Sequence, residues 1–491
     1  MRRMEKDEFL RLAEQYRTIP VYQRVLADLL TPVSAYMSLQ KNSPYAFILE
    51  SVEKGTQYAR YSYVGINPKL VLEHRAGVTT VHGEDGKLET DEPFLSLLRN
   101  TKAAYATVKL PGLPSLSGGL VGYLGYETIT WVEDVPVRTE GDMGVPDAVF
   151  MLFEELVAFD HLMGQIVIFC NVPIDYDTNL HEAFAHAHER IDVIREMLQT
   201  NVHPQTPIRV EQSKLHSNLT KSQFHAAVQR AKDYITTGDA FQIVLSQQFH
   251  RRTPVEPITL YRALRTVNPS PYMFHLKLND FDIIGASPEL LVKVSDGEVE
   301  VRPIAGTRPR GGSPEEDAAL AAELLADEKE RAEHLMLLDL GRNDVGRVAE
   351  YGSVHVDEQM VVENYSHVMH IVSDVKGRLN GKHDALDALM NTFPAGTTTG
   401  APKIRAMEII HELEPTRRGI YSGAVGYLDF CGDLNTCIAI RTMVMKDGIV
   451  TFQSGAGIVY DSDPEKEYLE TVSKAEAIMS AIDLAERGLV S

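Results

Sequence analysis

The chain has 491 residues, 44% hydrophobic and 24% charged, which is typical of a globular protein with a sizeable core. Its formal net charge of −21 would repel a phosphate backbone, so we expect no nucleic-acid partner. An anionic substrate stays possible where arginine, lysine, backbone N–H groups or a metal reverse the field locally. No stretch approaches the ~18 apolar residues of a membrane span, and residues 1–20 contain no signal-like apolar core. We therefore expect a cytoplasmic protein with no membrane partner.

A polar stretch with two prolines, 198–218, is the best candidate for an internal boundary. It separates an N-terminal region, 1–210, from a C-terminal region, 220–491. The N-terminal region contains short β-rich runs followed by one stretch with helical spacing, at 45–51, 60–65, 149–159 and, for the helix, 181–199.

The C-terminal region opens with a capping-box pattern, Thr220 with Gln223, and its first helix is expected to end at Gly238. Strands are then expected near 241–249, 271–276, 281–286 and 298–305, and a helix-rich block over 314–340.

Strands return near the C-terminus, at 422–430, 435–445 and 449–459. Asp447-Gly448 is a hairpin signal between the last two, and Asp463-Pro464 marks the start of a final helix. Because the strands lie mostly in hairpins and do not alternate with helices, the sequence favours the α+β class.

Two pairs of carboxylates have the spacing of neighbours on one helix face. Glu330 and Glu333 form one pair, and Glu467 and Glu470 the other, with Lys474 one turn further along. Either pair alone suits a solvated helix face, where charge runs usually lie. Carboxylate oxygens at this spacing would also suit Mg²⁺, which takes one or two carboxylates together with water and substrate oxygens.

Three further features concern anion binding. The stretch 396–403 lacks the Gly-Lys-Ser/Thr end of a nucleotide-binding loop, because Pro402 precedes Lys403. Ser-Gly-Ala-Gly within 453–467 lets backbone N–H groups approach an anion, and a plain glycine turn explains it equally well. Arg441 lies in an apolar strand and needs a partner, either a substrate carboxylate held bidentately or a structural salt bridge.

Taken together, these segments resemble the signature segments of chorismate-utilising enzymes. The similarity runs from about 220 to 485 and includes, in order, PIAGTRPRG, EKERAEHLMLLDLGRND, YSHVMHIVS, FPAGTTTGAPK, YSGAVGYL, CIAIRT and QSGAGIVYDSDPEKEYLET. ILESVEKG and ARYSYVG extend it into the N-terminal region. The resemblance implies an α+β fold of two large antiparallel sheets packed against each other, with helices on the outside.

The resemblance also implies the roles of individual residues. Glu333 and Glu470 match the Mg²⁺ ligands, supported directly or through water by Glu330 and Glu467. The matching chorismate-binding residues, with two more nearby, are Gly306, Thr307, Tyr421, Arg441 and the Gly455-Ala456-Gly457 backbone, then Thr397 and Lys474. Glu289 matches the general acid that protonates the departing 4-hydroxyl. His370 matches the active-site histidine, for which we hypothesise a role in pyruvate elimination.

Family members differ in the nucleophile that they add to the ring. Members that add water have a lysine where this chain has Gln242, and aminodeoxychorismate synthases typically have a nucleophilic lysine where it has Ala305. Ammonia needs no deprotonation once delivered as NH₃. We therefore predict ammonia attack at C2 and loss of pyruvate to give anthranilate, the first step of tryptophan synthesis. One alternative is aminodeoxychorismate synthesis, against which Ala305 argues. The other is a non-catalytic subunit that senses chorismate or tryptophan, which the intact carboxylates and His370 disfavour.

Regulation and ammonia supply are the last expectations. A group of residues resembles the tryptophan feedback pocket of anthranilate synthases, although core packing explains it equally well taken alone: Glu50, Ser51, Pro271, Tyr272 and Met273. No cysteine lies in a glutaminase-like Gly-x-Cys-x-Gly loop; the three are Cys170, Cys431 and Cys437. The resemblance therefore implies a separate glutamine amidotransferase subunit that supplies ammonia.

Overall fold

A computed structural model describes residues 2–51, 60–200, 210, 213–365 and 368–489. Parts of three sequence features lie outside these described residues: most of the boundary stretch 198–218, the VEKG of ILESVEKG with Ala59, and Ser366 and His367 of YSHVMHIVS. Among the described residues, no helix is both long and apolar enough to span a bilayer.

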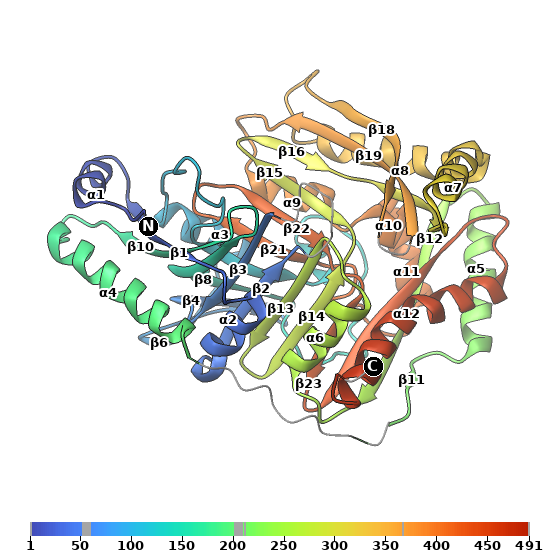
Figure 1. Ribbon diagram of the computed structural model, residues 1–491. Coiled ribbons are helices and arrows are strands. Elements are labelled where there is room, and N and C mark those ends of the chain that lie inside the picture. The colour runs from blue at the N-terminus through green and yellow to red at the C-terminus, as the bar shows by residue number, and fades with distance from the viewer. Residues whose placement is uncertain (1, 52–59, 201–209, 211–212, 366–367, 490–491) are drawn as a thin grey trace.

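The first of two large sheets contains twelve strands within the described residues: β1 (Thr18–Leu26), β2 (Tyr45–Glu50), β3 (Tyr61–Ile66), β9 (Glu155–Asp160), β10 (Gln165–Pro173), β11 (His216–Ser217), β12 (Gln242–Arg252), β13 (Tyr272–Leu278), β14 (Phe281–Ser287), β20 (Gly400–Ala401), β23 (Thr442–Lys446) and β24 (Ile449–Ile458). Their order is β1-β10-β9-β3-β2-β13-β14-β23-β24-β12-β11, with β20 beside β12. Strands from both sides of the 198–218 stretch therefore share this sheet (Figure 1).

The second sheet also contains twelve strands within the described residues: β4 (Leu70–Arg75), β5 (Val78–Gly83), β6 (Gly86–Thr90), β7 (Gly119–Leu124), β8 (Ala148–Phe153), β15 (Leu290–Ser295), β16 (Glu298–Val301), β17 (Ile304–Pro309), β18 (His355–Asn364), β19 (Val368–Arg378), β21 (Ala424–Asp429) and β22 (Leu434–Ile438). Their order is β17-β19-β16-β15-β22-β21-β7-β8-β4-β5-β6, with β18 beside β19. Neighbouring strands run antiparallel, for example β7 beside β8 and β21.

The core between the two sheets forms because successive side chains of a strand point to opposite faces of its sheet, as β8 shows. Val149 and Phe153 of β8 point toward the first sheet, where the Phe153 ring lies 4.7 Å from Phe47 of β2, centroid to centroid. Phe150 points to the opposite face and packs with Phe94 in a second core. Because β8 is buried on both faces, its sequence is continuously apolar and does not alternate with polar residues.

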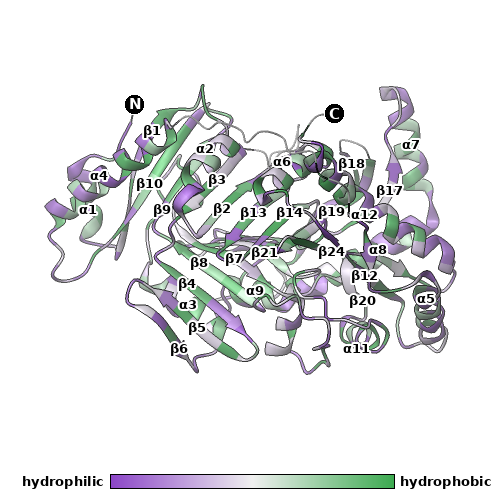
Figure 2. Cartoon of the chain, turned by 90° about the horizontal axis from the view of Figure 1, so that it is seen from below, coloured by the Kyte–Doolittle hydropathy of each residue, from purple (hydrophilic) through white to green (hydrophobic). Residues whose placement is uncertain are grey.

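The helices cover the outer faces of the sheets, and polar residues lie on peripheral ones such as α1 and α4 (Figure 2). Within the described residues they are α1 (Lys6–Ala13), α2 (Pro32–Leu39), α3 (Phe94–Ala104), α4 (Leu180–Leu198), α5 (Lys221–Thr236), α6 (Pro257–Val267), α7 (Pro314–Ala326), α8 (Glu328–Gly346), α9 (Ala385–Thr392), α10 (Gly396–Thr399), α11 (Lys403–Leu413) and α12 (Pro464–Glu486), with two 3₁₀ turns at Gln40–Asn42 and Tyr126–Trp131. The predicted α+β architecture of two packed antiparallel sheets with helices outside is confirmed.

Local signals in the sequence were reliable. Thr220 caps α5 in a reciprocal capping box with Gln223, and Gly238 follows the helix with φ of 88°. Asp463 caps α12 by accepting from the amides of Glu465 and Lys466. Asp447-Gly448 joins β23 to β24 with positive φ at both residues.

Four expected elements are each divided in the structure. The run 298–305 contains β16 and the first residues of β17, both of which belong to the second sheet. The helix-rich block 314–340 is two helices, α7 and α8, because Asp327 ends the first and caps the second. The runs 149–159 and 435–445 each contain two strands that belong to different sheets, β8 with β9 and β22 with β23. Such runs are buried on both faces, so they carry no periodicity that would mark the crossing.

Candidate active site

A cavity of about 840 Å³ lies where β12 and β24 of the first sheet meet β17 and β19 of the second, bordered by α8, α10 and α12. The expected general acid Glu289 and the expected active-site His370 line it, together with Thr397 and with Gln242, which replaces the lysine of water-adding members. Most of the expected substrate-binding residues also line it: Gly306, Thr307, Tyr421, Arg441, Gly455, Gly457 and Lys474. Residues from segments as far apart as Gln242 and Lys474 are thus brought together.

The glycines of β24 form a wall where the backbone itself meets the cavity. A Cβ at Gly455 would lie 2.7 Å from the Tyr421 hydroxyl oxygen and 2.9 Å from the Leu245 carbonyl oxygen. A Cβ at Gly457 would lie 2.4 Å from Nε2 of Gln242. Ala456 points the other way, into a buried apolar cluster, as strand alternation requires. Ala456, one of the expected substrate-binding residues, is therefore absent from the lining of the described cavity.

Arg441 lies in the crossing between sheets and not inside a strand, which corrects the sequence interpretation. β22 ends at Ile438 in the second sheet, β23 begins at Thr442 in the first, and Arg441 has φ of 51°. Its guanidinium lines the cavity and donates a hydrogen bond to the Lys474 carbonyl. Arginine stays charged even when buried, so this residue supplies positive charge to the cavity.

Glu289 lies in the loop between β14 and β15 and faces Thr397 at the start of α10. The Thr397 hydroxyl donates to Oε2 of Glu289 at 2.9 Å. Burial raises the pKa of the Glu289 carboxyl, while this hydrogen bond, Lys474 and Arg441 act in the opposite direction. A buried carboxyl with a raised pKa is suited to donate a proton to a leaving group.

His370 on β19 is held by the neighbouring strand β17, which carries Gly306. Its Nδ1 lies 2.9 Å from the Gly306 carbonyl oxygen and 3.1 Å from the Thr307 hydroxyl oxygen. A carbonyl accepts only, so we assign the proton to Nδ1, which leaves the Nε2 lone pair available. Burial lowers the pKa of His370, and the neutral imidazole can therefore act as a base near neutral pH.

Four carboxylates come from two helices beside the cavity. Glu330 and Glu333 on α8 and Glu470 on α12 line it, whereas Glu467 is absent from the lining of the described cavity. Burial raises the pKa of Glu333, and the carboxylates of Glu330 and Glu470 add to the rise. Three acidic groups therefore influence one another across the gap between the helices.

The three carboxylates that line the cavity each have a side-chain partner already, which is a cation for two of them and an amide for the third. Oε1 of Glu330 accepts from Nη1 of Arg308 at 3.0 Å, and Nζ of Lys474 lies 2.6 Å from Oε1 of Glu470. Nε2 of Gln242 donates to Glu333 at 3.3 Å, while its buried Oε1 has no hydrogen-bond partner in the described structure. Over the described ranges, no three His, Cys, Asp or Glu side chains are already grouped to hold a metal ion.

The expected tryptophan residues lie together, separate from the lining of this cavity. Met273 of β13 pairs with Glu50 of β2, and Ser51, Pro271 and Tyr272 adjoin them in sequence. The buried Glu50 carboxylate accepts from the Tyr261 hydroxyl and lies 3.2 Å from Nε of Arg265.

Ser51 completes this group. Its hydroxyl oxygen is buried and has no hydrogen-bond partner within the described residues. The Glu50 carboxylate of the expected pocket is thus already paired with Arg265, and the next residue in the chain carries a buried hydroxyl without a partner in the described structure.

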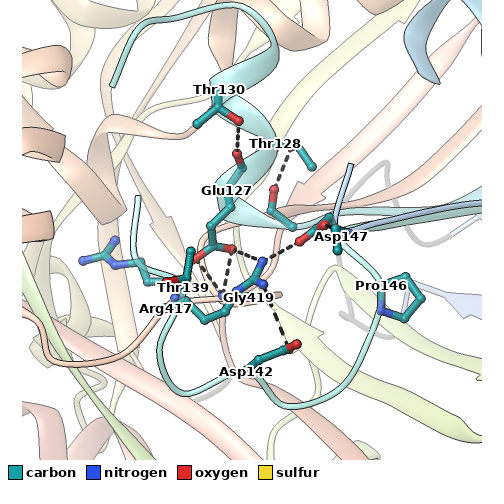
Figure 3. A network of polar contacts seen from close by, with 12 residues as sticks. Glu127, Thr128, Thr130, Thr139, Asp142, Pro146, Asp147, Arg417 and Gly419 are labelled. Carbon is teal, nitrogen blue, oxygen red and sulfur yellow. Dashed lines mark hydrogen bonds and ion pairs between the residues drawn. The ribbon is translucent and has the colours of Figure 1, made fainter. Parts of the chain in front are cut away.

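Sequence reasoning missed a buried ionic network behind the cavity wall. Arg417 and Arg418 follow α11 in a polar Pro-Thr-Arg-Arg-Gly turn, which reads as an exposed loop. In the structure, Arg417 pairs with Glu127 and Asp147 (Figure 3). The Arg418 side chain beside it is almost completely buried. The only signal in the sequence was the pair of adjacent arginines, which does not reveal burial.

Comparisons with known proteins agree with this geometry. Residues 44–480 match the family model described as chorismate binding enzyme. The chain is 46% identical over 487 residues to anthranilate synthase component 1 of Acetivibrio thermocellus, covering 98% of each chain. It is 48% identical over 500 residues to that of Synechocystis sp., covering 97% of this chain and 98% of the relative. The crystal structure of anthranilate synthase component I from Streptococcus pneumoniae TIGR4 superposes with a TM-score of 0.78 at 38% identity, covering 93% of this chain and 99% of that one.

Proposed function

The chain belongs to the anthranilate synthase component 1 group of the chorismate-binding enzymes, and we propose that it converts chorismate and ammonia into anthranilate and pyruvate with Mg²⁺ as cofactor. One observation carries this proposal: a buried acid, Glu289, faces a cavity that holds Arg441 and a glycine backbone wall. That combination supports a reaction in which an anion is held while a hydroxyl leaves.

In the first half of the proposed reaction, ammonia forms a bond to C2 of the ring, and the 4-hydroxyl departs as water. Glu289 supplies the proton to the leaving oxygen, since burial favours its protonated form. Gln242 cannot activate water as a lysine at its position would, and Ala305 cannot form the covalent intermediate that a lysine at its position would form. Ammonia attack needs neither group.

In the second half, the amino intermediate loses its C2 proton and the enolpyruvyl C–O bond breaks, which yields anthranilate and, after protonation of the enol, pyruvate. Nε2 of His370 is the candidate base, because Nδ1 is engaged by the Gly306 carbonyl and the pKa of the ring is lowered. The anionic substrate would be held by Arg441, Tyr421 and the Gly455–Gly457 backbone.

The residues present fit Mg²⁺ as the proposed cofactor. Glu333 and Glu470 would hold the ion, with Glu330 and Glu467 supporting it, and all four offer the hard oxygen donors that Mg²⁺ prefers. Burial raises the pKa of Glu333 and of Glu467, and neighbouring carboxylates add to the rise in both, an excess of negative charge that a cation would relieve. When bound, Mg²⁺ supplies charge neutralisation for a substrate carboxylate. Ammonia-dependent activity of Glu470→Ala tests this assignment. We expect the activity to be lost, and full retention of the activity would contradict the assignment.

We further propose that ammonia comes from a separate glutamine amidotransferase subunit. The name component 1, carried by the relatives, supports a partner component. Cys170 and Cys437 are buried, and burial raises the pKa of both thiols, which makes them poor nucleophiles. The isolated chain should therefore use ammonium ions but not glutamine. Anthranilate formation from glutamine by the isolated chain would contradict this part.

Feedback inhibition by tryptophan is proposed for the group around Glu50 and Ser51. Arg265 and Tyr261 hold the buried Glu50 carboxylate, and Ser51, the next residue in the chain, has a buried hydroxyl without a partner in the described structure. A phenylalanine at Ser51 would put a ring where a small buried hydroxyl stands, so Ser51→Phe should reduce inhibition while ammonia-dependent turnover persists. A Ser51→Phe enzyme as sensitive to tryptophan as the parent would refute this pocket.

A further inference from the structure

Arg418 is a buried guanidinium directly behind one wall of the cavity. It lies in the turn between α11 and β21, and only 2% of the residue is exposed. Its Nε and Nη2 donate to the two oxygens of Glu414 at 2.9 and 2.7 Å, a bidentate pair. The charge is thus fully desolvated but compensated, which is the condition under which a buried ion pair is retained.

The remaining donors of Arg418 fix the cavity wall. Nη1 donates to the Thr398 carbonyl at 2.7 Å, and Nη2 donates to the Val244 carbonyl at 2.8 Å. Both Thr398 and Val244 line the cavity, whereas Arg418 itself is not among its lining residues within the described chain. One side chain therefore ties α10 to β12 from behind.

Arg418 also lies over two aromatic rings. Its guanidinium carbon is 5.5 Å from the centroid of the Tyr421 ring and 4.9 Å from that of Tyr126. Burial raises the pKa of Tyr421 to about 12, and the Arg418 charge acts in the opposite direction. A cation on the face of a phenol is attracted by the ring and makes its hydroxyl a stronger donor.

We propose that Arg418 is a positioning residue that acts through Tyr421, fixing its ring against the cavity wall and strengthening its hydroxyl as a donor to a carboxylate of chorismate. The inference rests on the proposed function, because it takes Tyr421 as a contact of the substrate. Arg418 does not touch chorismate in this proposal, but it determines how tightly Tyr421 binds chorismate.

The neighbouring Arg417 provides a matched control. It lies in the same turn and is largely buried, and its guanidinium pairs with Glu127 at 3.3 Å and with Asp147 (Figure 3). Arg417→Lys therefore perturbs a buried ion pair of the same kind one residue away, whose partners lie on the 3₁₀ turn Tyr126–Trp131 and the segment before β8.

The test is a double-mutant cycle on chorismate affinity, with Arg418→Lys, Tyr421→Phe and the double variant. Isothermal titration of chorismate without ammonia measures binding independently of turnover, and thermal unfolding reports stability separately. We expect Arg418→Lys to weaken chorismate binding about tenfold in the parent and by less than about twofold in the Tyr421→Phe background. Arg417→Lys should change chorismate affinity by less than about twofold in either background.

The outcomes separate this inference from the proposed function. An equal loss of affinity from Arg418→Lys in both backgrounds would show a general structural role and overturn the inference, while the proposed reaction would stand. Tyr421→Phe with parental affinity would remove Tyr421 as a contact and overturn the inference with it.

Glu414→Gln is a second variant that keeps Arg418 in place while removing its counter-charge, for use if Arg418→Lys does not fold. It should tighten chorismate binding only while Tyr421 is present. The same change in the Tyr421→Phe background would again overturn the inference.

Discussion

Gly455→Ala is the substitution whose consequence can be worked most directly from the geometry of the cavity wall. The added methyl would lie 2.7 Å from the Tyr421 hydroxyl oxygen, whereas carbon and oxygen atoms ordinarily approach no closer than about 3.3 Å. The Leu245 carbonyl, 2.9 Å away, belongs to β12, which is paired with β24 and cannot yield freely. The Tyr421 hydroxyl must therefore retreat by about 0.6 Å, the difference between 3.3 and 2.7.

Two effects should follow from that displacement. Overpacking of this kind costs about 1–3 kcal/mol of unfolding free energy. A misplaced substrate contact should raise the chorismate KM about tenfold, since a shift of about 1 Å can cost a hundredfold. Ammonia-dependent turnover measures the KM, and denaturant unfolding measures the free energy.

Gly346→Ala is the matched control, because apart from its chain neighbours and the backbone of its own helix no atom lies within 4 Å of a Cβ at this position at the end of α8. It should raise the unfolding free energy by about 0.5 kcal/mol and leave the chorismate KM unchanged. If Gly455→Ala also leaves the KM at the parental value, with unfolding changed by less than about 0.5 kcal/mol, the steric reasoning about this wall is refuted.

Three further predictions concern proton transfer in the cavity. Glu289→Gln should lower kcat at least about a hundredfold with little change in the chorismate KM, and a kcat within about threefold of the parent would exclude Glu289 as the acid. Thr397→Val removes a hydrogen bond that lowers the pKa of Glu289. The alkaline limb of the pH–rate profile, where this acid loses its proton, should therefore move to higher pH. An alkaline limb at the parental pH would contradict this. His370 must be neutral to act as a base, and burial lowers its pKa. The acidic limb of the pH–rate profile should therefore lie below pH about 6.5 and disappear in His370→Ala. An acidic limb above that pH would contradict the effect of burial on this pKa.

Local chemistry in the sequence predicted the ends of elements well. The helix caps at Thr220 and Asp463 and the turn at Asp447-Gly448 depend on side chains and backbone conformations a few residues apart, and all three were confirmed. The crossings between sheets at 149–159 and 435–445 depend on which distant strand each half pairs with. An apolar run buried on both faces does not record that choice.

The cavity could be assembled from the sequence only through the resemblance to a family. Spacing alone placed Glu330 beside Glu333 and Glu467 beside Glu470, but it did not place the two pairs on neighbouring helices. Arg418 was missed altogether, because its neighbours are polar and its burial comes from packing of distant segments.

We propose that this cavity directs ammonia, and not water, to chorismate and then expels pyruvate. Mass spectrometry of the product formed by the purified chain from chorismate, Mg²⁺ and ¹⁵N-labelled ammonium tests it directly. We expect ¹⁵N-labelled anthranilate in equal amount with pyruvate. Isochorismate, or an aminodeoxychorismate that accumulates without pyruvate release, would contradict it.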